Sequence, residues 1–427
     1  MGRKVNFIVL AIFVLIALFS GASYHLDQDT SALDTGDTAW MLVASAFVLL
    51  MTPGLGFFYG GMVSKKNIIS TIMQSFVALG VISVLWVVVG FSLAFGDSIG
   101  GIIGNPLTYF GFKGVGVAPN PDFAETIPFL LFALFQLKFA IITPALITGS
   151  FAERVRFRSY ILFMVFFAIF IYAPLAHMTW HPDGLFRNWG VLDFAGGTVV
   201  HMSAGFAALA GAFILGRRKQ VTHEPSNVPY IILGTGMLWF GWFGFNAGSA
   251  LGANTDAALA FSNTNIASAT AMITWMFYER FQNRKMSAMG ACIGAVVGLV
   301  AITPAAGFVT IGQSVFIGFI AALVSNWAIA VKNRSRLDDT LDVFPSHGVG
   351  GIVGMILTAV FAEEVGLVYG ETTTFLYHML ALVIVAIFTF CGSWLIYKLV
   401  DKIVPLRVNE EQEIRGLDLS QHGEQVD

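Results

Sequence analysis

Charged residues are scarce in this sequence. Asp, Glu, Lys and Arg make up 11% of its 427 residues, whereas soluble globular domains carry about 25%. This shortage excludes an ordinary soluble domain. The formal net charge of -3 is also too small to indicate nucleic acid or another strongly charged partner. Hydrophobic residues instead make up 56% of the chain, which is typical of a membrane protein.

Cysteine and nucleotide-binding patterns are also lacking. The two cysteines, Cys292 and Cys391, lie inside apolar runs, where cysteine acts as a small hydrophobic residue, so no disulfide framework is implied. The segment 211–218 lacks the Lys-Ser/Thr pair of a phosphate loop, and ATP-driven pumping is therefore unsupported. No nucleophile and base form a recognisable constellation. We expect neither an enzyme nor a cofactor.

Long apolar segments recur along the chain with short polar breaks between them. Helices are the only elements of this length that satisfy every backbone group within lipid. We therefore predict an all-α polytopic membrane protein with eleven transmembrane helices. The expected spans are 39–62, 69–96, 126–151, 159–178, 194–215, 230–250, 256–278, 287–304, 308–331, 344–362 and 374–399.

Lys and Arg are distributed unevenly among the breaks. Most of them occur in every second break and in the C-terminal tail, whereas the alternate breaks hold only Lys113 and Arg187. The positive-inside rule then places the basic loops and the C-terminus in the cytoplasm and the mature N-terminus outside. Termini on opposite sides require an odd number of spans, which agrees with eleven.

The N-terminus has the pattern of a signal peptide. Arg3 and Lys4 precede an apolar run over 5–19, and small residues follow at 20–23. The alternative is a first membrane helix, although the run is shorter than the roughly 20 residues of a span. We predict a signal peptide at 1–23, a transmembrane domain at 24–403 and a cytoplasmic tail at 404–427.

Two similarities between the halves suggest an internal repeat. The sequence Ile-Thr-Pro-Ala occurs at 142–145 in the third expected span and at 302–305 in the eighth. Histidines lie in the fifth and tenth. An offset of five helices gives a five-plus-five inverted repeat, an arrangement in which transporters often place a site at the repeat interface.

The two histidines, His201 and His347, are the strongest candidates for chemistry. Ionisable groups inside a membrane are costly and therefore point to function. One imidazole nitrogen donates and the other accepts, so a facing pair can share a proton and pass it on. Zinc would need three or four ligands, and no Cys or third His is near either residue. We therefore expect no metal.

Several segments resemble those of the ammonium transporter (Amt/Rh) family, and the resemblance covers nearly the whole chain from about residue 38. These segments are 57–61 (FFYGG), Phe135-Gln136 with Phe139, 152–154 (AER), 193–201 (DFAGGTVVH), 241–249 (GWFGFNAGS), 342–348 (DVFPSHG) and 404–413 (VPLRVNEEQE).

This resemblance implies a set of pore residues. Trp180, Phe139 and Ser249 match an external recruitment site for the ammonium ion, where aromatic faces and a hydroxyl attract a small cation. Phe139 and Phe245 match a stacked phenylalanine gate, and the twin histidines follow beneath it. The resemblance further implies a homotrimer in the inner (plasma) membrane and a cytoplasmic regulator of the PII type.

Several of these residues also have a simpler structural explanation. Trp180 is also suited to an aromatic belt at the membrane interface, and among 40 Phe any one can be core packing. Asp193 can cap the helix that follows it. The resemblance adds only an indirect role for Asp193 in shaping the cation site.

Lys138 departs from the expected pattern. It lies near the middle of the third span, where a lysine costs about 2.5–3.5 kcal/mol on insertion scales. The helical angles allow it to approach the pore or a subunit contact. A charged Lys138 in the pore would repel cations, and the protein would then act as an ammonium sensor or binding module with little transport.

Overall fold

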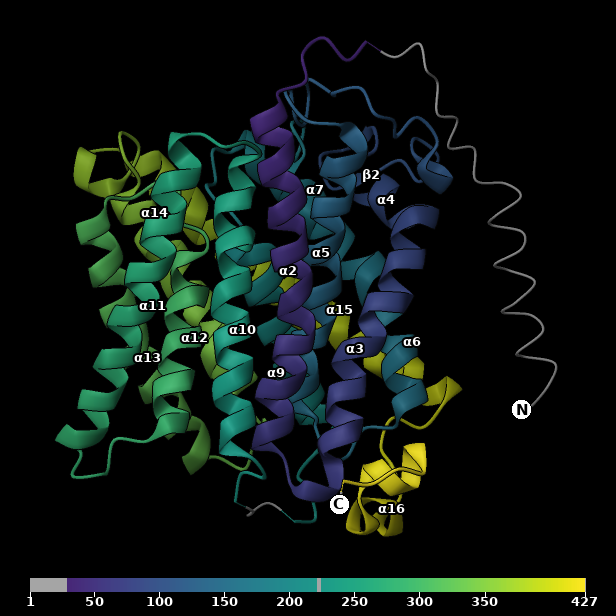
Figure 1. The fold of residues 1–427 in the computed structure, drawn as a ribbon. Helices are drawn as coiled ribbons and strands as arrows, with labels where there is room; N and C mark the ends of the chain where they lie inside the picture. Colours follow the sequence, from purple (N-terminus) through teal and green to yellow (C-terminus); the bar gives the residue numbers. More distant parts are fainter. Residues whose placement is uncertain (1–28, 221–223, 427) are drawn as a thin grey trace.

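The computed structural model describes residues 29–220 and 224–426. The predicted signal peptide lies outside the described residues. The described chain is a bundle of long helices that cross the molecule in alternating directions, with short connections at both ends (Figure 1).

The bundle is built from long helices, several of which are interrupted by π-helical segments. The α-helices are α2 (Thr35–Met62), α3 (Ile68–Leu85), α4 (Phe91–Phe95), α5 (Phe129–Ile147), α6 (Phe157–Phe167), α7 (Ala173–Trp180), α8 (Leu185–Asn188), α9 (Ser203–Leu215), α10 (Val228–Ala247), α11 (Thr255–Phe281), α12 (Ala288–Ile302), α13 (Ile311–Arg334), α14 (Gly350–Phe361), α15 (Thr372–Ile403) and α16 (Glu410–Arg415). The π-helical segments are η2 (Trp86–Gly90), η5 (Ala168–Tyr172), η6 (Gly197–Met202), η8 (Phe344–Val349) and η10 (Asp418–His422). The 3-10 turns are η1 (Lys65–Asn67), η3 (Phe110–Phe112), η4 (Thr148–Ser150), η7 (Gly248–Ala250) and η9 (Leu367–Tyr369). A small antiparallel hairpin pairs β1 (Ser98–Ile99) with β2 (Ile103–Gly104).

The described chain is mostly helical, in agreement with the expected α-helical membrane protein. Among the described residues, nine helices are long and apolar enough to cross a membrane. The expected spans at 256–278 and 287–304 are also helical, as α11 and α12, but neither is among those nine. The 15 residues of α12 reach only about 22 Å, short of a hydrocarbon core of about 30 Å. Eleven crossings and the repeat remain predictions.

Glycines set the close packing of several helices. A Cβ added at Gly234 of α10 would lie 2.3 Å from the backbone nitrogen of Phe58 in α2. A Cβ at Gly205 of α9 would lie 2.3 Å from the backbone of Gly348 in η8. Small residues allow helices in lipid to approach this closely, and van der Waals contact between them then stabilises the bundle.

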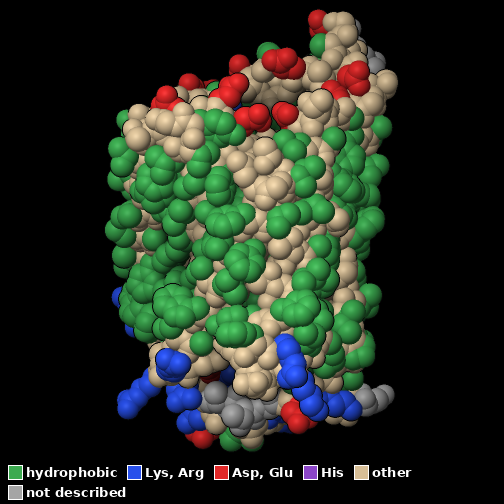
Figure 2. Space-filling view, turned by 90° about the vertical axis from the view of Figure 1, so that its left-hand side faces the viewer, with side chains coloured by type: hydrophobic (Ala, Val, Ile, Leu, Met, Phe, Trp, Pro, Cys, Tyr) green, Lys and Arg blue, Asp and Glu red, His purple; other side chains and the backbone are tan. Residues whose placement is uncertain are grey.

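The two ends of the molecule carry opposite charges. On the face formed by α11, α13 and α14, a broad hydrophobic band separates one end, where Lys and Arg gather beside a few acidic side chains, from the other end, where Asp and Glu gather (Figure 2). The C-terminal tail lies at the basic end (Figure 1). There the Asp418 carboxylate accepts hydrogen bonds from the backbone N–H groups of Ile69 and Ser70, which ties the tail to the first turn of α3.

Candidate functional site

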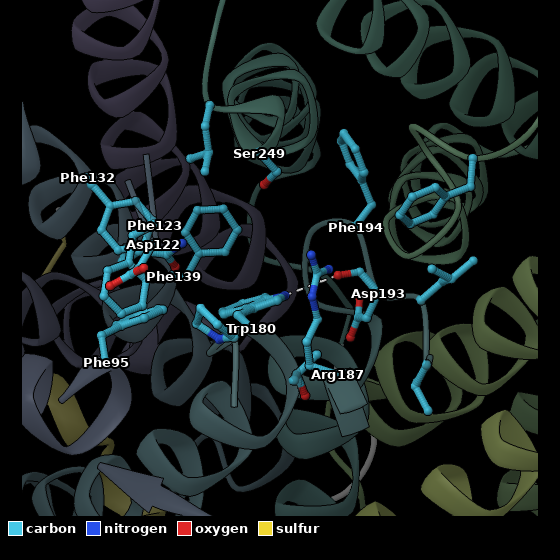
Figure 3. Close-up of a pocket in the computed structure, with 17 residues that line it drawn as sticks. Phe95, Asp122, Phe123, Phe132, Phe139, Trp180, Arg187, Asp193, Phe194 and Ser249 are labelled. Carbon is cyan, nitrogen blue, oxygen red and sulfur yellow. Dashed lines mark hydrogen bonds between the residues drawn. The ribbon is translucent and has the colours of Figure 1, made fainter. Parts of the chain in front are cut away.

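A cavity of about 560 Å³ opens at the end of the bundle opposite the tail; we call it the vestibule. Its walls come from α4, α5, α7, η7 and the loops that precede α5 and η6 (Figure 3). The long connection over 97–125 supplies Asp122 and Phe123, so this loop does contribute to the mouth. The lining residues are Phe95, Asp122, Phe123, Phe132, Gln136, Phe139, Thr179, Trp180, Pro182, Arg187, Val191, Leu192, Asp193, Phe194, Ser249, Leu251 and Phe308.

All four residues assigned to ammonium recruitment line the vestibule. The ring of Phe139 meets the Trp180 indole edge-on, with centroids 5.8 Å apart. Ser249 donates its hydroxyl proton to the carbonyl oxygen of Phe245 over 2.9 Å, so its oxygen lone pairs remain as acceptors. Figure 3 shows Trp180, Phe139 and Ser249 around one hollow. The vestibule thus combines aromatic rings with a hydroxyl acceptor.

The Asp193 carboxylate binds backbone N–H groups of the following segment instead of pointing its free lone pairs into the vestibule. One carboxylate oxygen accepts from the N–H groups of Gly196 and Gly197, and the other accepts from the N–H and hydroxyl of Thr198, over 2.5–2.8 Å. Burial raises the pKa of Asp193, although these hydrogen bonds act in the opposite direction. Its backbone oxygen accepts from the Trp180 indole over 3.1 Å (Figure 3). The predicted cap is therefore present at the start of η6, and it also fixes Trp180.

Charged residues that the sequence did not assign also reach the vestibule. Asp122 and Arg187 are both among its lining residues. Arg187 stood out in the sequence only as one of two cations in the alternate breaks. Asp122 gave no signal, because nothing in a Gly- and Pro-rich loop predicts where its side chains will lie.

The predicted gate residues are in contact below the vestibule. Phe139 of α5 and Phe245 of α10 have centroids 4.2 Å apart with a tilt of 31°, and both side chains are buried. The ring of Phe245 also lies 6.1 Å from the imidazole of His201. The two phenyl rings thus separate the vestibule from the histidines.

His201 and His347 face each other beneath these two phenyl rings. Their Nδ1 atoms are 3.3 Å apart and both rings are buried. In a hydrogen bond between these two atoms, one nitrogen must donate and the other accept. A narrow hollow of about 10 Å³ adjoins His347, between Tyr59 and Ser346, and this is about the space of one water.

Trp242 is a neighbour of His201 that sequence reasoning missed. Its indole stacks on the His201 ring, with centroids 5.3 Å apart and a tilt of 19°. It is held there by a 2.9 Å hydrogen bond to the Thr303 hydroxyl. Trp242 precedes Phe245 by three positions in the same helix, which places them on one face. This three-residue spacing from Phe245 was the sequence feature from which the position of Trp242 could have been predicted.

The two histidine segments are anchored in the same way. His201 lies in η6 and His347 in η8, and π-helical turns of this kind are frequent at functional sites. Asp193 and Asp339 each lie eight positions before their histidine. Asp339 accepts from the backbone N–H groups of the residues at 343 and 344, over 3.2 and 2.7 Å. The quoted motif began at Asp342, which instead forms a 2.5 Å ion pair with Lys332.

Known proteins match this chain over most of its length. The sequence model of the Ammonium Transporter Family matches residues 39–426. The chain belongs to this family. An ammonium transporter of Aquifex aeolicus is 48% identical, covering 97% of both chains. One of Bacillus subtilis is 45% identical over 92% of this chain and 99% of its own.

Solved structures show the same fold. The crystal structure of Saccharomyces cerevisiae Mep2 superposes with a TM-score of 0.84 at 34% identity, covering 90% of this chain and 89% of that one. A structure described as Sensor Amt Protein gives 0.83 at 31% identity, covering 91% and 98%. Membership of this transporter family supports ammonium as substrate and a location in the membrane.

Lys138 of this ammonium transporter family member lies away from the vestibule. It is partly exposed on α5, as is Leu134 one turn before it. It is not among the vestibule residues, although its neighbour Phe139 is. Within the described part of the chain, Lys138 forms no ion pair. The described residues also contain no cluster of three His, Cys, Asp or Glu suited to a metal.

Proposed function

We propose that the chain transports ammonium by separating the ion into ammonia and a proton inside the pore. The vestibule recruits the cation, the two phenyl rings exclude hydrated ions, and the histidine pair carries the proton. The observation on which this proposal rests is the 3.3 Å contact between the Nδ1 atoms of His201 and His347, directly beneath the Phe139–Phe245 contact.

Recruitment follows from the chemistry of the vestibule walls. An ammonium ion over an indole or phenyl face is stabilised by roughly 0.5–2 kcal/mol. Trp180 and Phe139 supply such faces, and the Ser249 oxygen can accept one of the four N–H bonds of the ion. Asp193 takes no direct part, because four protein donors already occupy its oxygens.

Separation of the ion lowers the cost of the crossing. A bare cation is expensive to move across about 30 Å of hydrocarbon, whereas neutral ammonia is not. Phe139 and Phe245 must move apart to let ammonia pass. His201 and His347 give the proton a separate route, since imidazole can accept on one nitrogen and donate from the other.

Ammonium-evoked current tests this function. Purified protein in liposomes on a supported membrane should give a current that rises to saturation with ammonium. Replacing both His201 and His347 by leucine should abolish the proton-coupled current and leave the assembly intact. As a matched control, His378→Gln changes a buried histidine that lies outside the column and bonds Leu192 and Met355. Unchanged saturating current in the double variant would refute the relay.

A sensor with little or no transport is the alternative function. It is favoured by the likeness to the structure described as Sensor Amt Protein. Saturable ammonium binding to the purified protein, without any current, would establish the sensor and overturn transport.

We further propose that the protein is a homotrimer in the plasma membrane with one pore per subunit. The exposed apolar side chains of α2 and α10 offer surface for subunit contacts or lipid. Native mass measurement tests the trimer.

The basic end is proposed to be cytoplasmic and to bind a PII-type regulator, and protease accessibility in sealed vesicles tests this orientation. Sequencing the N-terminus of the mature protein tests cleavage at 1–23.

A further inference from the structure

A groove of about 660 Å³ lies on the outer surface near the basic end, between α9, α13 and η8. Its walls are almost wholly apolar. Phe213 of α9 and Trp327 and Val331 of α13 line it, and these side chains are 47–63% exposed. Phe344 and Val349, the first and last residues of η8, also contribute to the lining.

Cations surround the end of this groove. Arg217 follows α9, Arg336 follows α13, and both line the groove with exposed side chains. Lys332 lies there too, but it is paired with Asp342 over 2.5 Å. Within residues 29–220 and 224–426, Arg217 and Arg336 have no acidic partner for their guanidinium groups. Two free cations therefore lie beside an apolar wall.

We propose that this groove binds an anionic phospholipid. The acyl chains pack against Phe213, Trp327 and Val331, and the phosphate lies between Arg217 and Arg336. The charge distribution supports this occupant, because basic groups at the end of an apolar groove between membrane helices suit a lipid phosphate with its tails. A small soluble anion would leave the apolar wall unoccupied. In Figure 2 the Lys and Arg side chains gather where the hydrophobic band ends, which is the expected depth of a headgroup.

The bound lipid would lie against the segment that holds a pore histidine. His347 is within η8, whose two end residues line the groove. The lipid would therefore contact both ends of η8 and stabilise the position of this segment. Lipid binding at this groove is independent of whether the pore transports or senses ammonium.

Lipid binding to the purified full-length chain in detergent tests this proposal. The probes are phosphatidylglycerol and phosphatidylcholine with identical brominated acyl chains, which quench nearby tryptophans. The chain has nine Trp, so the quenching that disappears in Trp327→Phe reports the groove. We expect phosphatidylglycerol to quench this component at lower concentration than phosphatidylcholine does.

Substitutions separate the headgroup from the tails. Arg217→Gln with Arg336→Gln should weaken phosphatidylglycerol binding roughly thirtyfold, since each cation near a membrane surface contributes about a factor of five. Phosphatidylcholine binding should weaken less, because the choline ammonium offsets the charge of its phosphate. The matched control, Arg280→Gln with Arg284→Gln, removes two exposed arginines at the end of α11 and should change neither lipid. Ala328→Phe fills part of the groove without adding a tryptophan and should weaken both.

Three results would overturn the proposal. The first is equal affinity for the two lipids in the parent protein. The second is displacement of phosphatidylglycerol by inorganic phosphate at comparable concentration, which would indicate a site for small anions. The third is loss of groove quenching whenever subunits associate, which would show that a second copy of the chain covers this face.

Discussion

Asp193 is the residue whose replacement most directly tests how the vestibule is built. Its carboxylate accepts four hydrogen bonds, from the N–H groups of Gly196, Gly197 and Thr198 and from the Thr198 hydroxyl. In Asp193→Asn the amide oxygen can still accept from two N–H groups, but the amide nitrogen faces the N–H of Thr198. The Thr198 N–H therefore loses its acceptor, whereas the Thr198 hydroxyl can rotate and accept a hydrogen bond from the amide nitrogen.

The expected loss of stability follows from these contacts. One charge-assisted hydrogen bond to a buried backbone donor is worth about 1.5–3 kcal/mol, so Asp193→Asn should destabilise the protein by about that amount. Asp193→Ala orphans three buried N–H groups, and at about 1–3 kcal/mol each its cost should be at least about 3 kcal/mol. The start of η6, and with it His201, should become less ordered.

Unfolding and transport should be measured on the same preparations. The prediction is a lower unfolding temperature in detergent, in the order parent, Asn and Ala. The maximum current should be reduced and the half-saturating ammonium concentration unchanged. Asp122→Asn is the matched control, because Asp122 is an exposed acid that lines the vestibule but makes none of these bonds. It should keep the parental stability.

The opposite pattern would refute the reasoning. If Asp193 bound the cation directly, Asp193→Asn would keep parental stability and raise the half-saturating concentration instead. A carboxylate whose oxygens are both occupied by protein donors cannot show that behaviour.

The remaining predictions concern the basic end, Lys138 and the helix contacts. Arg218→Met should destabilise the protein by about 3–5 kcal/mol in thermal unfolding, since it removes the cation that pairs with the buried carboxylates of Glu153 and Asp338. Burial alone would raise the pKa of Asp338, but the hydrogen bonds and charge of Arg218, together with the charge of Arg154, outweigh it and lower that pKa. This stabilisation is therefore present at neutral pH and is lost as the pH falls through the lowered pKa. It should be smaller in the pH profile of Arg218→Met, in which the charge of Arg154 remains. Lys138→Met should give parental current, whereas a gain would place its charge in the pore. Gly205→Ala should lower the unfolding temperature and the current, because its Cβ would lie 2.3 Å from a neighbouring backbone. Gly80→Ala is the control: its Cβ would have open space around it, so neither quantity should change.

The sequence alone determined the class of this protein. Apolar segments separated by charged breaks are a property of the local sequence, and lipid permits only helices for them. His201 and His347 stood out because ionisable groups are rare within apolar segments, but His177 and His378 also lie within the expected spans, so rarity alone did not single out this pair. Phe139 and Phe245 could be assigned to a gate only through the family resemblance, since nothing local distinguishes them from the other phenylalanines.

Tertiary structure decided which side chains meet. Trp242 against His201, Asp339 beneath η8 and Asp122 at the vestibule each depend on contacts between distant parts of the chain. Lys138 shows the same limit, because its spacing from Phe139 fixed the angle between them but not the direction of either residue. Helical periodicity determines which residues share a face. The neighbour of that face is set only when the helices pack, through close approaches such as that of Gly205 to Gly348.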